Sequence, residues 1–258
     1  MLLGHDAGVK LALLSDLHAN LRALDACLAH ARAAGATRFA ILGDLVGYGP
    51  EPVQVLQRVM DLVTRGAIVV RGNHDDAALH EPAVRQTAQD LSAAWTHAQL
   101  SDVHRSFLLH LPLAATVEDT LLVHASARDP QQWEYVDRPE MARRCLLAAQ
   151  AEWGLKRVFC GHVHEQVLYY RGVDGKPMAF NPVPGVPVPL ASHRSWLALV
   201  GSVGQPRDGD PRAMYALFDV AQARLAFHRI AYDHAGTAAA IRAAGLPEGF
   251  AQRLERGR

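Results

Sequence analysis

The beginning of the chain alternates short apolar runs with segments of helical period, and this alternation constrains the fold more than any other feature. Residues 9–15 form an apolar run, residues 21–35 repeat apolar side chains at helical spacing, and residues 38–42 form the next run. A second helical segment, which Pro52 opens, leads to a third run at 67–71. This β-α-β-α-β order predicts a largely parallel sheet with right-handed crossovers.

The middle of the chain predicts a helical insertion followed by further strands. Residues 76–111 are rich in alanine and have a helical period, so we expect an insertion over one side of the sheet. Residues 113–117 and 120–123 flank a short polar turn and predict a hairpin. A helix over 139–153 and a buried strand over 157–160 follow.

After this point the predicted strands follow one another without intervening helices. They are expected at 166–171, 178–180, 196–200, 214–220 and 224–231. This order predicts a second, more antiparallel sheet that packs face to face on the first, within an α/β protein. Residues 182–189 read as a proline-rich loop and residues 235–258 as terminal helices.

Size and charge limit the class of protein. The 258 residues, half of them hydrophobic and 20% charged, suit one α/β domain over 1–258. Lys plus Arg and Asp plus Glu both number 26, which gives a formal net charge of zero. A protein that moves along nucleic acid usually carries a basic excess, so the sequence gives no strong nucleic-acid signal.

The cysteines and the apolar segments indicate a cytoplasmic protein. Cys27, Cys145 and Cys160 have no CxxC spacing, so neither a disulfide framework nor a zinc ribbon is expected. The longest stretch without Asp, Glu, Lys or Arg is rich in proline and cannot be a membrane-spanning helix. The N-terminus lacks a cationic start and a small-residue cleavage site, so we expect no signal peptide.

Residues of the kinds that bind metals follow five successive predicted strands. They are Asp16-Leu17-His18, Gly43-Asp44, Gly72-Asn73-His74-Asp75, His124 and Gly161-His162-Val163-His164. Each motif alone has an ordinary explanation, such as a capping aspartate, a turn or a histidine of the core. Their coincidence at one sheet edge, where α/β proteins build their sites, predicts a metal centre.

The residue types indicate which ions such a centre would bind. Carboxylate, imidazole and amide oxygen suit Mn, Fe, Zn or Co, while the absence of cysteine ligands argues against a structural zinc site. Two ions about 3.5–4 Å apart need one bridging carboxylate, and a water between them becomes hydroxide at neutral pH. Glycines before Asp44, Asn73 and His162 permit sharp turns close to the ions.

The order D-x-H, G-D-x-x-G, G-N-H-D, H-A-S and G-H-x-H resembles the calcineurin-like metallophosphoesterase superfamily, over residues 11–207. Three segments are similar to the small bacterial branch that includes YfcE-like phosphodiesterases and some diadenosine tetraphosphate hydrolases. They are residues 15–20 (SDLHAN), 43–50 (GDLVGYGP) and 201–207 (GSVGQPR). The resemblance implies a four-layer α-β-β-α sandwich of two mixed sheets.

The resemblance also implies roles for individual residues. Asp16, His18 and His164 would bind one ion, Asp44 would bridge, and Asn73, His124 and His162 would bind the other. His74 would face the substrate, either stabilising the phosphoryl oxygens or donating a proton to the leaving group. The resemblance leaves the metal open among Mn, Fe, Zn and Co, with Mn favoured.

The sequence departs from the family pattern at three places. Protein Ser/Thr phosphatases carry Asp-Arg-Gly after G-D-x-x, whereas this chain has Gly47-Tyr48-Gly49, which weakens a protein-phosphatase assignment. The usual glycine of the first motif is Ala19. The usual Asn-Pro-Gly-Ser appears as residues 199–202 (LVGS), so that loop is expected to bend differently.

Several residues around the motifs are predicted to contact substrate. Arg128 and Arg207 could bind phosphate through their planar guanidinium groups, and surface salt bridging is the alternative. Trp133, Tyr135 and Tyr48 could form a stacking platform for a base, and core packing is the alternative. A further predicted contact is Asn20, at the end of the first motif.

Together these features predict a binuclear metal-dependent phosphoesterase. It would hydrolyse a small phosphomonoester, phosphodiester or nucleotide anhydride by attack of metal-bound hydroxide. A dinucleoside polyphosphate hydrolase and a nuclease are alternatives, and the neutral charge counts against the nuclease. A non-catalytic nucleotide or metal sensor is a remote alternative, because every expected ligand and His74 are present. The expected partner is a small phosphorylated substrate, and the sequence leaves the oligomeric state open.

Overall fold

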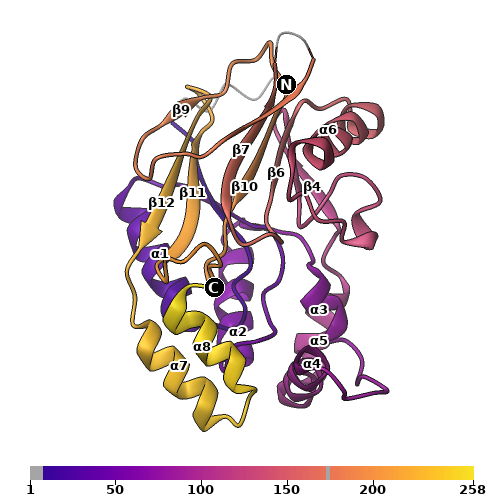
Figure 1. Ribbon diagram of the computed structural model, residues 1–258, viewed down its shortest axis with the longest axis vertical. Helices are drawn as coiled ribbons and strands as arrows, with labels where there is room; N and C mark the ends of the chain where they lie inside the picture. Colours follow the sequence, from indigo (N-terminus) through magenta and orange to yellow (C-terminus); the bar gives the residue numbers. More distant parts are fainter. Residues whose placement is uncertain (1–7, 173–174) are drawn as a thin grey trace.

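Two six-stranded mixed sheets form the centre of the computed structural model, which describes residues 8–172 and 175–258 (Figure 1). The first seven residues, on which the argument against a signal peptide rests, therefore lie outside the described residues. In spatial order the first sheet holds β3 (Ile68–Val69), β2 (Arg38–Ile41), β1 (Lys10–Leu14), β11 (Ala213–Asp219), β12 (Arg224–Ile230) and β9 (Val188–Pro189). The second holds β4 (Ala114–Val117), β5 (Thr120–Val123), β6 (Arg157–Cys160), β10 (Trp196–Val200), β7 (Gln166–Arg171) and β8 (Pro177–Phe180).

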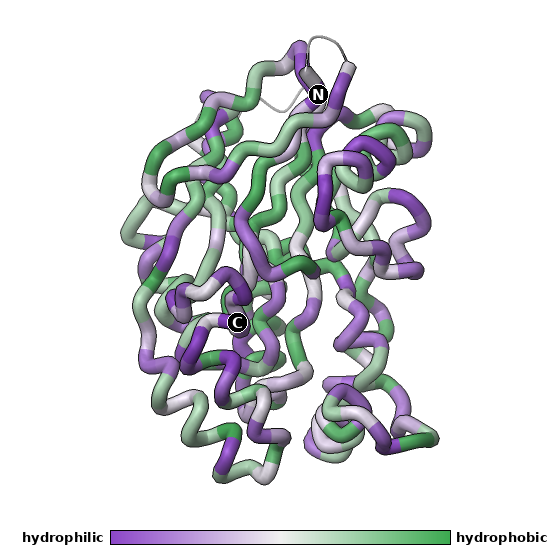
Figure 2. The backbone as a smooth tube through the Cα atoms, viewed as in Figure 1, coloured by the Kyte–Doolittle hydropathy of each residue, from purple (hydrophilic) through white to green (hydrophobic). Residues whose placement is uncertain are grey.

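Alternating side chains of the buried strands build a layered core. Leu11 and Leu13 of β1 face the second sheet, while Ala12 and Leu14 face the helices α1 (Leu21–Ala33) and α2 (Pro52–Val63). The outer face of the second sheet is covered by α6 (Pro139–Trp153). In Figure 2 the apolar colour is concentrated along the central strands. The predicted four-layer α-β-β-α sandwich is confirmed.

The composition of the two sheets differs from the expectation that the later strands form a sheet of their own. Strands β11 and β12 join the first sheet, where β11 pairs antiparallel with β1. Strands β7, β8 and β10 join the second sheet beside β6. The cause is the burial of β1, which needs a hydrogen-bonding neighbour at each edge, and β2 fills only one of them. The proline-rich loop also contributes β9, a short edge strand.

Two groups of helices flank the end of the sandwich at which β1 terminates. Figure 1 shows α3 (Asn73–Ala77), α4 (Ala88–Gln99) and α5 (Asp102–Leu109) on one side of this end. On the opposite side lie α7 (His234–Ala243) and α8 (Glu248–Arg256). Among the residues that the structure describes, none of the helices has both the length and the apolar composition to span a bilayer.

Candidate metal centre

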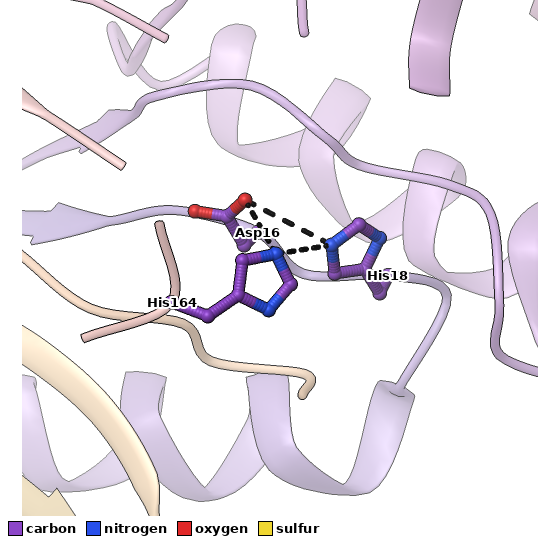
Figure 3. Close-up of side chains that lie close together, drawn as sticks. All are labelled: Asp16, His18 and His164. Atoms are coloured by element: carbon purple, nitrogen blue, oxygen red, sulfur yellow. Dashed lines mark hydrogen bonds and ion pairs between the residues drawn. The ribbon is translucent and has the colours of Figure 1, made fainter. Parts of the chain in front are cut away.

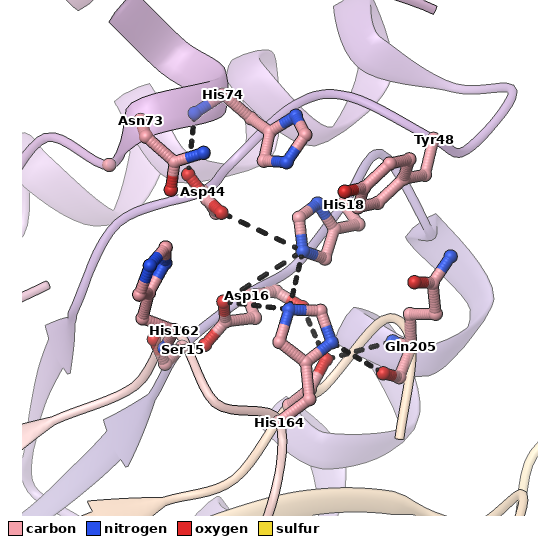
Figure 4. A network of polar contacts seen from close by, with 12 residues as sticks. Ser15, Asp16, His18, Asp44, Tyr48, Asn73, His74, His162, His164 and Gln205 are labelled. Carbon is pink, nitrogen blue, oxygen red and sulfur yellow. Dashed lines mark hydrogen bonds and ion pairs between the residues drawn. The ribbon is translucent and has the colours of Figure 1, made fainter. Parts of the chain in front are cut away.

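All seven residues predicted to bind metal lie at one edge of the two sheets. Asp16 and His18 follow β1, Asp44 follows β2, and Asn73 begins α3 just after β3. The second sheet supplies the others, with His124 after β5 and both His162 and His164 after β6. Two groups of these side chains come close enough to hold an ion, and Figure 4 shows the first group beside Asp44, Asn73 and His162.

The backbone at this edge is left-handed at five of these residues. Asp16, His18, Asp44, His162 and His164 have φ between +46° and +67°. For residues with a Cβ this conformation costs about 1–2 kcal/mol each, and such positions cluster at functional sites. Hydrogen bonds between the loops hold them: Asp16 N–H donates to Gly43 O at 3.0 Å and His162 N–H to Asp16 Oδ2 at 2.9 Å.

The first cluster consists of Asp16, His18 and His164 (Figure 3). The Nδ1 atoms of His18 and His164 lie 3.3 Å from Val46 O and 2.6 Å from Gln205 O. A carbonyl oxygen can only accept a hydrogen bond, so each Nδ1 carries the ring proton. In the neutral ring each Nε2 then has a free lone pair. The two Nε2 atoms are 3.1 Å apart, and His164 Nε2 is 3.1 Å from Asp16 Oδ1.

This first cluster fits a cation. All three side chains are buried, and Asp16 Oδ1 has no hydrogen-bond partner. Two imidazole lone pairs and a carboxylate oxygen thus converge with no donor between them. Buried acceptors in that arrangement repel one another unless a proton or a metal ion lies among them.

The second cluster has the same construction. His124 donates from Nδ1 to Leu42 O at 2.7 Å, so Nε2 is the ring atom that is available to a metal ion once it has lost its proton. That Nε2 lies 3.1 Å from His162 Nδ1, 3.1 Å from Asn73 Oδ1 and 3.4 Å from Asp44 Oδ2. Two ring nitrogens, an amide oxygen and a carboxylate oxygen are ligands suited to a borderline divalent ion.

Asp44 lies between the two clusters. Its Oδ1 accepts the backbone N–H of His74 at 2.8 Å. Its Oδ2 lies 3.4 Å from His124 Nε2 in one cluster and 3.7 Å from His18 Nε2 in the other. One carboxylate oxygen therefore faces both sets of imidazoles, as a bridging ligand must.

The protonation of the cluster follows from burial and charge. Burial alone would raise the pKa of Asp16 and Asp44, but neighbouring imidazoles lower both pKa values below the usual range. Burial lowers the pKa of His18, and it lowers that of His162 to about 4. Burial also opposes a charge on His124, yet Asp44 raises its pKa to about 9. In the metal-free protein a proton on His124 thus neutralises part of the carboxylate charge.

The affinity for metal should fall as the pH falls. His124 keeps its proton at every pH below its pKa of about 9, so an ion bound in the second cluster must displace that proton. One displaced proton lowers the affinity about tenfold for each pH unit below 9. Chelator competition at pH 6.5, 7.5 and 8.5 measures the slope. An affinity that is independent of pH, or that rises in acid, would contradict this protonation.

His74 lies beside the two clusters without joining either. Its ring centroid is 5.1 Å from that of His18 and 4.3 Å from that of Tyr48. Gly47 makes room for it, since a Cβ there would lie 2.9 Å from His74 Nδ1. Burial lowers the pKa of His74, so the ring is neutral at pH 7 and still donates one N–H.

Asp75 is a residue of this site to which the sequence analysis assigns no role. Its Oδ1 accepts the backbone N–H groups of Leu45 and Val46 at 2.8 and 3.2 Å, and its Oδ2 accepts that of Gly72 at 2.9 Å. It thereby joins the loop that carries Asp44 to the one that carries His74. An aspartate at the third position of a helix that glycine precedes is the signal that could have indicated this role.

Two predicted substrate contacts have other partners. Asn20 is 1% exposed, caps α1 by accepting from Ala23 N–H, and donates to Gly204 O at 2.9 Å. Its amide is thus fully used within the fold. Arg128 donates from Nη2 to Glu134 Oε1 at 2.7 Å, which is the surface salt bridge that we weighed as the alternative.

The three aromatic residues do not form one platform. Tyr135 is half exposed, and its ring centroid lies 4.0 Å from that of His162. Trp133 lies 5.9 Å from the ring of His124 on the same side. Tyr48 is only 3% exposed and packs against His18, on the other side of the centre, so it cannot stack on a base. Core packing, the stated alternative, applies to Tyr48 alone.

Comparison with known proteins agrees with this geometry. The sequence profile described as the calcineurin-like phosphoesterase superfamily domain matches residues 9–223. A crystal structure of a metallophosphoesterase from Sphaerobacter thermophilus is 34% identical with a TM-score of 0.86, covering 97% of this chain and 99% of that one. A protein of Methanocaldococcus jannaschii named as uncharacterized is 28% identical over 96% of this chain and 98% of its own length. The symmetrical bis(5'-nucleosyl)-tetraphosphatase of Thioalkalivibrio sulfidiphilus is 37% identical over 41% of this chain and 38% of its own length.

Proposed function

Since this chain belongs to the calcineurin-like phosphoesterase superfamily, whose members are hydrolases with two divalent metal ions, we propose that it hydrolyses a small phosphate ester or anhydride at the two clusters. The observation that carries the proposal is the position of Asp44 Oδ2, which faces a histidine Nε2 of each cluster. The proposed ligands of one ion are Asp16, His18, Asp44 and His164, and those of the other are Asp44, Asn73, His124 and His162.

The residues of the chain have distinct tasks in this proposal. Bound divalent ions supply positive charge to phosphoryl oxygens and lower the pKa of water. Asp44 offsets the repulsion between two cations, and backbone carbonyls fix the ring orientation of His18, His124 and His164. His74 remains outside the ligand sets and can donate its N–H to a phosphoryl or leaving oxygen.

The ion is proposed to be manganese and the compartment the cytoplasm. Carboxylate, amide and imidazole donors without thiolate suit manganese. The three cysteines Cys27, Cys145 and Cys160 are free and buried, which suits a reducing compartment. Reconstitution with Mn, Fe, Zn and Co, followed by comparison of rates, tests the choice of ion.

Assays with the metal-reconstituted protein test the function itself. The substrates are p-nitrophenyl phosphate, its bis-ester and dinucleoside polyphosphates, and they separate monoesterase, diesterase and anhydride hydrolase. A protein that loads two ions but hydrolyses none of these substrates would instead support the non-catalytic sensor. A nuclease would cleave single- or double-stranded DNA in the same conditions, against the expectation from the neutral charge.

We propose further that the substrate contains a nucleotide. Tyr135 and Trp133 lie beside the rings of His162 and His124, so a base could stack there while its phosphate reaches the clusters. The tetraphosphatase of Thioalkalivibrio sulfidiphilus, similar over part of this chain, supports a substrate of this class. Dinucleoside polyphosphates are accordingly the first compounds to test.

Trp133→Ala should raise the KM for a dinucleoside polyphosphate by roughly 5- to 150-fold, because stacking on one base is worth about 1–3 kcal/mol. Hydrolysis of p-nitrophenyl phosphate should be nearly unchanged. Gln132→Ala, an exposed neighbour without a ring, is the matched control. Equal effects of Trp133→Ala on both substrates, or none on either, would show that this side chain only packs.

A further inference from the structure

A tyrosine, an arginine and the C-terminal helix pair meet on the His164 side of the metal centre. The ring of Tyr48 lies 4.6 Å from that of His18 and 4.3 Å from that of His74, and Figure 4 shows these three side chains. On its other side the ring of Phe250 lies 4.9 Å away. Gly49, next to it, can be only glycine, because a Cβ there would lie 2.1 Å from His18 O. The loop that carries Tyr48 is therefore held against both histidines.

Arg207 reaches the same place from the loop between β10 and β11. Its backbone N–H donates to His164 O at 3.3 Å, and its guanidinium carbon lies 5.9 Å from the centre of the Tyr48 ring. Its Nη2 donates to Gln205 Oε1 at 3.1 Å. Gln205 in turn offers its carbonyl oxygen to His164 Nδ1, so Arg207 is attached on two sides to a proposed metal ligand.

The charge of Arg207 is not matched by an acidic partner. Two aspartates follow it closely, but Asp208 pairs with Arg229 and Asp210 pairs with Arg212. Within residues 8–172 and 175–258 no carboxylate forms an ion pair with Arg207, and its Nε is buried without an acceptor. A partly buried guanidinium with unused donors beside a cluster of metal ligands is suited to bind an anion.

The C-terminal helices hold both residues in place. Phe250 of α8 packs on Tyr48, in a cluster that also contains Ile241 of α7. The backbone of the arginine loop is attached to the end of the same helix pair, since Gly209 N–H donates to Gly257 O at 2.7 Å. This helix pair lies beyond residue 223, where the match to the family profile ends.

We propose that Arg207 binds a non-bridging phosphoryl oxygen of the substrate, and that Tyr48 and the helix pair α7–α8 position it for this contact. This inference rests on the proposed function, because it places a phosphoryl group at the two clusters. The proposed cation comes from residues 201–207, and its guanidinium lies over the ring of Tyr48.

Binding of inorganic phosphate to the metal-loaded protein tests the contact without requiring turnover. Calorimetric titration of Arg207→Gln should show phosphate bound roughly 10- to 100-fold more weakly, as expected for a charge-assisted hydrogen bond. Arg207→Lys should lose less, because it keeps the charge but not the planar pair of donors. Arg212→Gln removes the same charge from the same loop, where Asp210 already pairs with it, and should bind phosphate normally.

Two results would overturn the contact. One is that Arg207→Gln with full metal content binds phosphate as tightly as the unmodified protein. The other is that Arg212→Gln loses as much affinity, which would indicate a general effect of charge. If the unmodified protein bound phosphate through Arg207 yet hydrolysed no phosphate ester, the proposed function would fail while the contact stood.

The positioning role is tested by a double-mutant cycle with Phe250→Leu, which keeps apolar volume and removes the ring. Phe250→Leu should weaken phosphate binding roughly 3- to 10-fold, and it should add little in the Arg207→Gln background because the two changes act on one contact. Metal content and thermal midpoint are measured for each variant. Fully additive losses would show that the helix pair does not act through Arg207.

Discussion

Asp44→Asn should abolish turnover and remove both metal ions, the largest effect that we expect from a single substitution. The asparagine keeps the shape of the side chain and can still accept the His74 N–H, which Asp44 accepts at 2.8 Å. What it loses is the negative charge of Oδ2, the atom that faces both clusters. Without that charge, two adjacent dications repel each other with no bridging anion between them.

Elemental analysis and activity of the reconstituted variant measure this effect together. Asp61→Asn, an exposed aspartate of α2, is the matched control and should retain both ions and full activity. One ion per chain in fully reconstituted, fully active unmodified protein would rule out the two-metal mechanism. An Asp44→Asn variant that keeps two ions and normal turnover would show that the charge of Asp44 is not needed to bridge them.

His74→Ala should keep both ions and lower the rate by roughly 10²–10⁴, which is the usual contribution of a positioned acid or base. The side chain is within reach of the clusters but belongs to neither group of ligands. Its backbone N–H, which holds Asp44, is retained in the alanine variant. His80→Ala changes an exposed histidine of the same segment and should have no effect on the rate.

A series of aryl phosphates separates the two roles that His74 could have. If the ring donates a proton to the leaving group, the defect should shrink for esters with good leaving groups. Because burial lowers its pKa and leaves the ring neutral at pH 7, proton donation by His74 would be confined to acid pH. An equal loss for good and poor leaving groups would instead assign His74 to the phosphoryl oxygens. A normal rate for every ester would exclude both roles.

The sequence predicts well those parts of the fold that local patterns determine. The strands β1 and β2 and the helix α1 lie where apolar period, caps and glycines indicate them. Local patterns do not predict which strand pairs with a buried strand. Leu11 to Leu14 are buried on both faces of the sheet, so their pattern does not distinguish a neighbour nearby in sequence from β11, some two hundred residues later.

The metal-binding motifs are predictable because each one ends a strand, and strand ends of one sheet edge lie together. The substrate contacts are less predictable from the sequence, since they depend on the direction in which each side chain points. The ring of Tyr48 is only 3% exposed and packs against His18, a direction that the local sequence does not indicate. Arg128 pairs with Glu134, six residues away, and the sequence does not distinguish this salt bridge from a contact with phosphate. The capping position of Asp75 after Gly72 indicates its bond to Gly72 N–H, but not its bonds to the backbone of the distant Asp44 loop.

Each candidate ion site draws its ligands from both sheets. Asp16 and His18 extend from the first sheet and meet His164 from the second, while Asp44 and Asn73 meet His124 and His162 across the same interface. Bound ions would therefore be cross-links between the two β layers, and their binding energy would belong to the folding free energy of the whole sandwich. Metal supply would then regulate how much of this protein survives proteolysis, as well as how much of it is active.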